Sequence, residues 1–191
     1  KLSVFIETYG CQMNEYDSDR ILNSLSGIPV NNPSDADVII VNTCAIREKA
    51  NHKAISAIGK YKNLKKSNPN LLIGMAGCVA QLYGNKLIKQ IPHLDFVVGP
   101  RGIPKLMNIV NGLKNSSNIT KRIETSMDIQ EVFEINPYHE KGKVSGFVSI
   151  QQGCNKKCTY CIVPTVRGEE INRSLKDILE ESRLLIKQGA K

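Results

Sequence analysis

Short apolar runs alternate along the first half of the chain with longer stretches in which apolar residues recur at helical spacing. Three of these runs are built alike, because each ends at a cysteine: SVFIETYGC, ADVIIVNTC and NLLIGMAGC. Continuous apolar runs such as VIIV are typical of strands that are covered on both faces in a parallel sheet. The pattern therefore predicts three parallel strands, each with a cysteine where it stops.

The stretches between these runs predict crossover helices. In the second stretch, Ala54, Ile58 and Tyr61 occupy the i, i+4 and i+7 positions of one helical face. Gly27 and Pro92 are placed to end the first and third helices. The apolar positions of those two helices are Ile21, Leu22 and Leu25, and then Leu82, Leu87, Ile88 and Ile91.

A further strand is expected at Phe96 to Val98, followed by a helix around Ile103 to Val110. The fold class predicted for residues 1–113 is therefore α/β, with a doubly wound, mainly parallel sheet. Residues 114–142 are polar and contain proline, so we expect a linker there, with a short strand at Glu131 to Ile135.

The pattern of a strand and a helix returns in residues 143–191. VSGFVSIQQG alternates like a strand and leads into a loop with three cysteines, and a helix is expected from about Ser174. One strand, one loop and one helix cannot form an independent core. We therefore expect this to be the first βα unit of a larger domain, and the chain to be a fragment. The predicted buried side of the helix is formed by Leu175, Ile178, Leu179, Leu184, Leu185 and Ile186.

Composition restricts the class of protein and its partners. The chain is 41% hydrophobic and 23% charged, has no apolar run long enough to span a membrane, and begins with a strand pattern instead of a signal peptide. We expect a cytoplasmic protein without a membrane partner. Six cysteines in that compartment favour metal or redox chemistry over disulfides. The formal net charge of +8 favours an anionic partner such as nucleic acid.

The strand-end cysteines, Cys11, Cys44 and Cys78, are far apart in the sequence. Parallel strands of a doubly wound sheet place their carboxyl ends along one edge, where ligands usually bind. We therefore predict a three-cysteine site at that edge. The alternative is three unrelated buried cysteines.

The loop cysteines, Cys154, Cys158 and Cys161, follow a CxxxCxxC spacing. Cysteine thiolates hold a [4Fe–4S] cluster, normally one for each iron, so three of them leave one iron open, much as catalytic zinc sites keep a position open. The bacterial ferredoxin spacing C-x₂-C-x₂-C-x₃-C-P is absent. Zinc sites usually have paired CxxC units, and the nearest histidine, His139, precedes the strand. This loop therefore predicts an open iron–sulfur site.

The loop GCNKKCTYC, with Tyr160 before its last cysteine, resembles the signature of the radical S-adenosylmethionine enzymes. This resemblance implies S-adenosylmethionine as a cofactor and a (β/α) partial barrel that is truncated here. Four other segments, TYGCQMNEYDS, NTCAIREKA, GCVAQ and VRGEE, occur in the order found in the methylthiotransferase family of that superfamily. In that family the N-terminal cysteines hold an auxiliary [4Fe–4S] cluster. The resemblance thus implies two [4Fe–4S] clusters.

The implied activity is the addition of a methylthio group to carbon 2 of N(6)-dimethylallyladenosine beside the anticodon of tRNA. Arg47, Glu48 and Lys49 resemble the prenyl-adenosine branch of the family, although they also suit the charged first turn of a helix. The other branches act on threonylcarbamoyl-adenosine in tRNA or on a ribosomal protein. An alternative of a different class is an iron–sulfur electron carrier or a metal-stabilised binding module.

The same resemblance implies partners and further site residues. The partners are tRNA bearing prenylated adenosine, an electron donor of the flavodoxin or ferredoxin type, and a protein that delivers sulfur or clusters. Gln12 and Asn14 would flank the auxiliary cluster and Asn42 would support the Cys44 turn, although all three are also common turn residues. Arg167 would lie near the active site, the alternative being a solvated basic residue. No catalytic residue is expected beyond the cluster ligands, and the chain alone is expected to be inactive.

Overall fold

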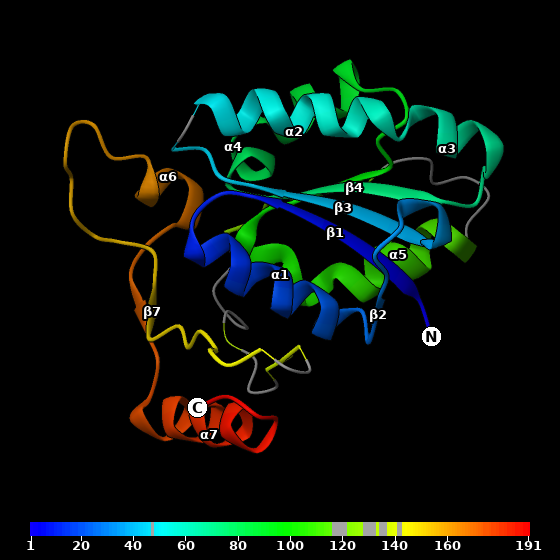
Figure 1. The fold of residues 1–191 in the computed structure, drawn as a ribbon. Coiled ribbons are helices and arrows are strands. Elements are labelled where there is room, and N and C mark those ends of the chain that lie inside the picture. The colour runs from blue at the N-terminus through cyan, green and yellow to red at the C-terminus, as the bar shows by residue number, and fades with distance from the viewer. Residues whose placement is uncertain (47, 116–121, 128–132, 134–136, 141–142) are drawn as a thin grey trace.

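A six-stranded sheet forms the centre of the molecule (Figure 1). The computed structural model describes the chain except for residues 47, 116–121, 128–132, 134–136 and 141–142. The strand order is β2-β1-β3-β4-β5-β6, and every neighbouring pair is parallel. The strands are β1 (Ser3–Tyr9), β2 (Ile28–Pro29), β3 (Val38–Thr43), β4 (Leu72–Gly77), β5 (Phe96–Val98) and β6 (Arg122–Glu124).

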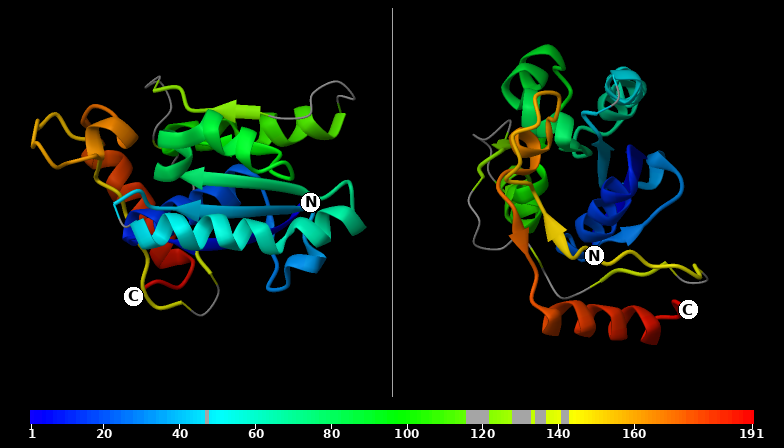
Figure 2. Two further views of the ribbon diagram at one scale, coloured as in Figure 1. Left: turned by 90° about the horizontal axis from the view of Figure 1, so that it is seen from above. Right: turned by 90° about the vertical axis from the view of Figure 1, so that its left-hand side faces the viewer.

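Helices cover both faces of this sheet, with α1 and α5 on one face and α2 and α4 on the other (Figures 1 and 2). Their bounds, with those of α3 and two short 3-10 helices, are α1 (Gln12–Ser24), η1 (Pro33–Asp35), α2 (Glu48–Lys60), α3 (Lys62–Ser67), α4 (Cys78–Gln90), η2 (Pro100–Lys105) and α5 (Leu106–Asn115). Successive residues of β3 alternate between two cores, since Ile39 packs in the α2/α4 layer and Ile40 in the α1/α5 layer. The predicted doubly wound parallel α/β fold is confirmed.

The strand order positions a site at one edge. The order 2-1-3-4-5 is one of the two common doubly wound orders, and it reverses between β1 and β3. Ligands of such sheets bind outside the carboxyl ends of the strands, near that point. The carboxyl ends of β1, β3 and β4 lead directly to Cys11, Cys44 and Cys78.

Two strands of the six-stranded sheet were not expected from the sequence. Ile28–Pro29 pairs with the start of β1, and Arg122–Glu124 pairs with β5 although it lies in the segment expected to be a linker. Both strands are only two or three residues long, so neither produces a periodic pattern. The short strand predicted at Glu131 to Ile135 falls, apart from Phe133, outside the described residues. The division into 1–113, 114–142 and 143–191 stays a prediction.

The second unit contains a small antiparallel pair of strands and two helices: β7 (Gln151–Gln152), α6 (Val163–Arg167), β8 (Ile171–Asn172) and α7 (Leu175–Lys187). The predicted strand is shorter than expected because its ladder partner β8 has only two residues. The helix starts where expected, with Ser174 Oγ accepting the Asp177 N–H at 3.1 Å as its N-cap. Its predicted buried side is wrong in part, because only Leu185 is buried whereas Leu175, Leu179 and Ile186 are exposed.

Candidate metal centre

The strand-end cysteines line one cavity of about 190 Å³ at the carboxyl edge of the sheet. Cys44 and Cys78 are buried, and Cys11 is exposed at the rim. A water molecule takes about 30 Å³ of liquid volume, so the cavity has room for a polyatomic group. The structure thus brings together three residues that the sequence separates by two crossover helices.

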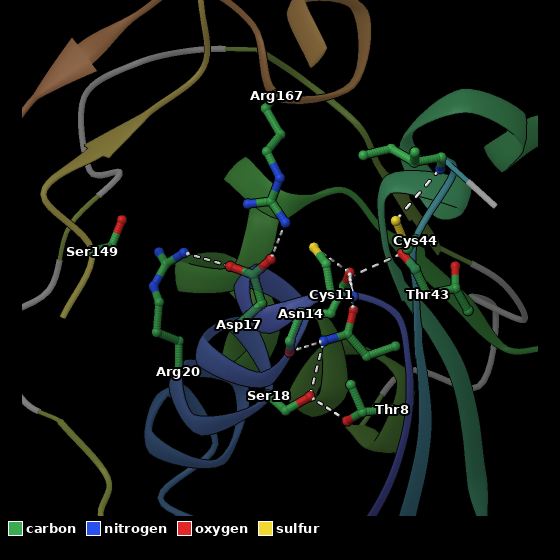
Figure 3. Close-up of polar contacts among 12 residues, drawn as sticks. Thr8, Cys11, Asn14, Asp17, Ser18, Arg20, Thr43, Cys44, Ser149 and Arg167 are labelled. Atoms are coloured by element: carbon green, nitrogen blue, oxygen red, sulfur yellow. Dashed lines mark hydrogen bonds and ion pairs between the residues drawn. The ribbon is translucent and has the colours of Figure 1, made fainter. Parts of the chain in front are cut away.

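A buried pair of asparagines, Asn14 and Asn42, fixes the turns that carry Cys11 and Cys44; Asn14 is labelled in Figure 3. Asn14 Nδ2 donates to Asn42 Oδ1 and to the Thr43 carbonyl, both at 3.1 Å. Asn42 Nδ2 donates in return to the Asn14 carbonyl at 2.7 Å and to Ser18 Oγ at 2.9 Å. Both amides are fully buried, where each lost partner would carry the full desolvation cost of the group. The pair therefore joins the start of α1 to the end of β3.

Cys11 is the N-cap residue of α1, and Asn14 lies at the third position of that helix. Asn14 Oδ1 accepts from the Cys11 N–H at 3.3 Å and from Cys11 Sγ at 3.5 Å. This arrangement is a capping box in which asparagine takes the usual place of glutamate or glutamine. Gln12, in contrast, has an exposed side chain and does not line the cavity.

Gly77 brings the third cysteine turn against the same asparagine pair. Its φ of +91° lies in the region that favours glycine. A Cβ at this position would lie 2.4 Å from Asn42 Oδ1 and 2.5 Å from the Thr43 carbonyl oxygen. Glycine is therefore required both by the backbone conformation and by the close approach, and it sets the position of Cys78.

Arg167 reaches this site from the second unit. It lies at the end of α6, which stands beside the carboxyl edge of the sheet (Figure 1), and its guanidinium is buried. Arg167 Nη2 donates to Asp17 Oδ2 at 2.6 Å, and Arg20 Nη1 lies 3.5 Å from Asp17 Oδ1 (Figure 3). Burial by itself would lower the pKa of Arg167, but Asp17 and Cys78 outweigh burial and raise it. Arg167 is therefore a charged group at the cavity wall.

Burial raises the pKa of the Cys78 thiol, and the nearby Arg167 guanidinium opposes that effect by its positive charge. The protonated thiol is thus the favoured form of the free side chain at neutral pH. Metals bind the thiolate, so loading of this site releases a proton.

Arg101 fastens the second unit to the sheet domain. Its Nε, Nη1 and Nη2 donate to the carbonyl oxygens of Arg167, Met127 and Glu169 at 2.9, 2.9 and 2.7 Å. Gly168 has a φ of +75°, and a Cβ there would lie 2.6 Å from Arg101 Nη2. Sequence reasoning missed Arg101, because its partners are backbone carbonyls and leave no side-chain pattern. Its one sequence signal is its position shortly after a strand end.

The loop cysteines lie nearer the surface. Cys154 and Cys161 are half-buried, whereas Cys158 is exposed and Tyr160 is 90% exposed. The Lys156 N–H donates to Cys154 Sγ at 3.4 Å, and the Cys154 N–H donates to the Gly168 carbonyl at 3.1 Å. A separate cavity of about 560 Å³ includes Cys154 in its wall but neither of the other loop cysteines.

Within the described residues, no three His, Cys, Asp or Glu side chains form a group that could hold a single metal ion. An iron–sulfur cluster makes a different demand, because each thiolate binds a different iron and the thiolates surround a group instead of a point. The strand-end cysteines fit that demand, since all three line one cavity and supply soft sulfur donors. The loop cysteines supply the same donors within one short segment.

The residues expected to identify the substrate branch are only partly described. Arg47 lies outside the described residues, as do the side chains of Glu48 and Lys49, whose backbone forms the first turn of α2. The structure gives no contact for this set, so its role stays a prediction.

The sheet domain carries the similarity to a known family. The model of a family described as "Uncharacterized protein family UPF0004" matches residues 3–99, which is about half of the chain. The chain belongs to the UPF0004 family. The matched residues include all three strand-end cysteines and the asparagine pair, and exclude the loop cysteines.

Curated relatives match this UPF0004 chain along nearly all of its length. Three are named tRNA-2-methylthio-N(6)-dimethylallyladenosine synthase. The relative from Thermodesulfovibrio yellowstonii is 45% identical over 193 residues, which cover 99% of this chain and 43% of the relative. The relatives from Cellvibrio japonicus and a Sulfurihydrogenibium species are 41% and 40% identical, with 98% and 100% of this chain and 42% and 44% of the relatives covered. The chain thus spans less than half the length of these relatives.

A solved structure is also similar in fold. It is the radical S-adenosylmethionine methyltransferase TsrM from Kitasatospora setae, with tryptophan substrate and an S-adenosylmethionine analogue bound. The TM-score is 0.61 at 12% identity, with 99% of this chain and 46% of that chain covered. At this identity the likeness concerns the fold alone, and it agrees with the α/β class. None of the helices described for the UPF0004 chain is long and apolar enough to span a membrane.

Proposed function

We propose that this UPF0004 chain provides the two cluster-binding units of a radical S-adenosylmethionine methylthiotransferase. The reaction is the addition of a methylthio group to carbon 2 of N(6)-dimethylallyladenosine next to the anticodon of tRNA. The observation that carries the proposal is that all three strand-end cysteines line one cavity, together with Arg167, which follows the CxxxCxxC segment and pairs with Asp17 of the sheet domain. Curated relatives with this activity in their names support it across nearly the whole chain.

Each cysteine set has a distinct role in this proposal. The strand-end cysteines would hold the auxiliary [4Fe–4S] cluster, and the loop cysteines would hold a second one with one iron left open for S-adenosylmethionine. When bound, the two clusters supply a radical route and a sulfur source. Carbon 2 of adenine needs such chemistry, because its hydrogen is neither acidic nor readily displaced by a nucleophile.

The chain's own side chains position these groups and exclude water. Asn14 and Asn42 orient the Cys11 and Cys44 turns, and Arg167 places a positive charge beside Cys78. Apolar residues complete much of the cavity wall and limit hydration, namely Met13, Ile46, Val163 and Val166. The carboxyl edge of the sheet therefore forms a partly apolar wall with one fixed cation.

The proposal also includes partners and a location. The net charge of +8 suits a tRNA substrate. An electron donor of the flavodoxin or ferredoxin type would deliver reducing equivalents, and a sulfur or cluster delivery protein would replace consumed sulfur. The cytoplasm fits this activity, since free thiols are kept reduced there and tRNA is present.

Iron analysis after anaerobic reconstitution tests the cluster assignment. We expect about eight irons per chain, falling to about four when either set of three cysteines is changed to alanine. Binding of zinc in place of iron, or no metal in the parent chain, would reject the cluster assignment.

The substrate is tested separately, with a protein of the relatives' full length that contains this chain. Prenylated tRNA should gain a methylthio group by nucleoside mass spectrometry, whereas methylthiolation of threonylcarbamoyl-adenosine or a ribosomal protein instead would assign another branch.

A further inference from the structure

Two hydrogen-bond donors in the wall of the strand-end cavity have no partner. Gln152 Nε2 and Arg167 Nη1 are both buried and make no hydrogen bond in the structure. Their side chains are only 3% and 6% exposed, and both residues line the cavity together with the strand-end cysteines. Most buried polar groups in folded proteins are hydrogen-bonded, so two unpaired donors on one wall indicate an acceptor in the cavity.

Arg167 is fixed at the cavity wall. Its other terminal nitrogen holds it there, because Nη2 donates to the fully buried Asp17 carboxylate at 2.6 Å. The backbone of Gln152 is placed by the pairing of β7 with Ile171 in β8, and its side chain is almost fully buried beside the cavity. Arg167 therefore keeps a donor at the cavity, and Gln152 lies close enough to supply a second one.

The chemistry of the two groups defines what they would contact. A guanidinium N–H and an amide N–H can only donate, and the guanidinium is also positively charged. An anionic acceptor fits both groups. Three thiolates and the sulfides of an iron–sulfur cluster form such an acceptor, and the same cavity holds the three thiols.

We propose that Gln152 and Arg167 donate hydrogen bonds to sulfur atoms of the cluster held by the strand-end cysteines. This inference rests on the proposed function, in which that cavity holds a [4Fe–4S] cluster. Hydrogen bonds to the sulfurs are among the factors that set a cluster's reduction potential. They favour the reduced, more negative form, so both residues raise the potential of the auxiliary cluster.

The two donors belong to the second unit, whereas the thiols belong to the sheet domain. Gln152 and Arg167 lie on either side of the loop cysteines in the sequence. The unit that carries the loop cysteines thus sets the reduction potential of the cluster that the strand-end cysteines hold. A change in how the two units dock would alter the potential of the auxiliary cluster.

A redox titration monitored by electron paramagnetic resonance tests this role. The whole chain carries Cys154→Ala/Cys158→Ala/Cys161→Ala, so that only the strand-end site loads. In this background Gln152→Met should lower the midpoint potential by about 59 mV, which is a tenfold change in the one-electron reduction equilibrium. Gln152→Glu, which puts a carboxylate in place of the donor, should lower it further. The control Gln188→Met removes an exposed amide that donates to the Pro137 carbonyl, and should leave the potential unchanged.

The outcomes separate this inference from the function on which it rests. If both Gln152 variants load about four irons and keep the parent potential, the inference is overturned and the cluster assignment stands. If the background chain binds no iron, the assignment fails and the inference fails with it. If neither Gln152 variant binds iron, the same redox titration of Arg167→Lys tests the inference. Lysine can keep the ion pair with Asp17 but lacks the fixed Nη1 donor. A lower potential supports the inference, and an unchanged potential overturns it.

Discussion

The strand-end cysteines and the loop cysteines reach their positions by different routes. The first set is dispersed over three strand ends, and the sheet register and a buried asparagine pair bring it together. The second set lies within one exposed loop, where local backbone hydrogen bonds hold the turns. Folding of the sheet therefore preorganises the strand-end site, whereas the loop site depends chiefly on its own short segment. A change in the sheet domain should consequently affect one site more than the other.

The two cysteine sites are not fully independent, because the sheet domain and the second unit contact each other. Arg101 extends from the sheet domain to three backbone carbonyls, two of them in the segment after the loop cysteines, and Arg167 extends back to Asp17. Each unit thus supplies an arginine to the other. Substitutions at the strand-end site and at this docking contact should therefore have different effects.

The largest effect is expected for Asp17→Ala. Asp17 is fully buried and accepts from Arg167, so its removal leaves a buried guanidinium without its anion. Breaking such a pair costs about 3–5 kcal/mol. The free energy of unfolding, measured by urea titration with circular dichroism, should fall by that amount. The exposed acid on the same helix gives the control, since Glu15→Ala should cost less than about 1 kcal/mol. Equal effects of the two substitutions would show that the pair is not structural.

A change at Gly77 should affect the strand-end site selectively. Gly77→Ala combines a positive φ with a Cβ at 2.4 Å from Asn42 Oδ1, and we expect a loss of about 3 kcal/mol. Gly189→Ala is the matched control, because Gly189 has a φ of +113° but nothing within 4 Å of an added Cβ. It should cost only about 1–2 kcal/mol.

Iron content of the same two variants sharpens the contrast between the sites. Under anaerobic reconstitution, Gly77→Ala should fall from about eight irons to about four, while Gly189→Ala keeps the parent value. Loss of all iron from Gly77→Ala would mean that the loop site also depends on the sheet edge. Retention of all iron would mean that the asparagine pair does not set the cysteine geometry.

Local patterns account for what the sequence could predict. The apolar runs before Cys11, Cys44 and Cys78 indicate buried parallel strands, and the topology of such sheets then places their ends together. Arg167 and Asp17 could not be paired in this way, because 150 residues separate them and no periodicity connects them. The same limit applies to β6, whose three residues are ordered by pairing with β5.

The hydrogen bonds and the burial of individual side chains could not be predicted from the sequence pattern either. The asparagines were singled out by resemblance, but their mutual hydrogen bonds depend on the register of β1, β3 and β4. In α7 the apolar stripe predicted a buried side, and Leu175 and Ile186 are nevertheless exposed. Periodicity shows which residues share a helix face, but burial also requires an element that packs on that face.

The smallest effect concerns the packing of the sheet domain against residues 137–139 and 143–147, away from both cysteine sites. Burial raises the pKa of Asp19 from 3.8 to about 6, while Lys143 and His139 oppose the shift and Glu140 and Glu15 add to it. The folded state therefore favours the protonated carboxyl. The protonated Asp19 carboxyl therefore adds to the free energy of unfolding. This contribution is complete below about pH 4 and is lost as the pH rises through about 6.

Asp19→Asn should therefore stabilise the chain at pH 7 by about 1 kcal/mol, a value reduced for the partial exposure of the carboxyl. The gain should shrink as the pH falls below about 6 and should disappear only below the ordinary pKa of 3.8, where Asp19 is protonated in both states. Urea unfolding at a series of pH values measures the difference, with Glu15→Gln as the exposed control on α1. A constant difference between pH 4 and pH 7 would contradict the titration. Iron content should stay at the parent value, because Asp19 lines the contact with residues 137–139 and 143–147 and lines neither cysteine cavity. A loss of iron from Asp19→Asn would show that this contact controls the strand-end site, and the contrast between a preorganised sheet edge and a separate docking surface would no longer hold.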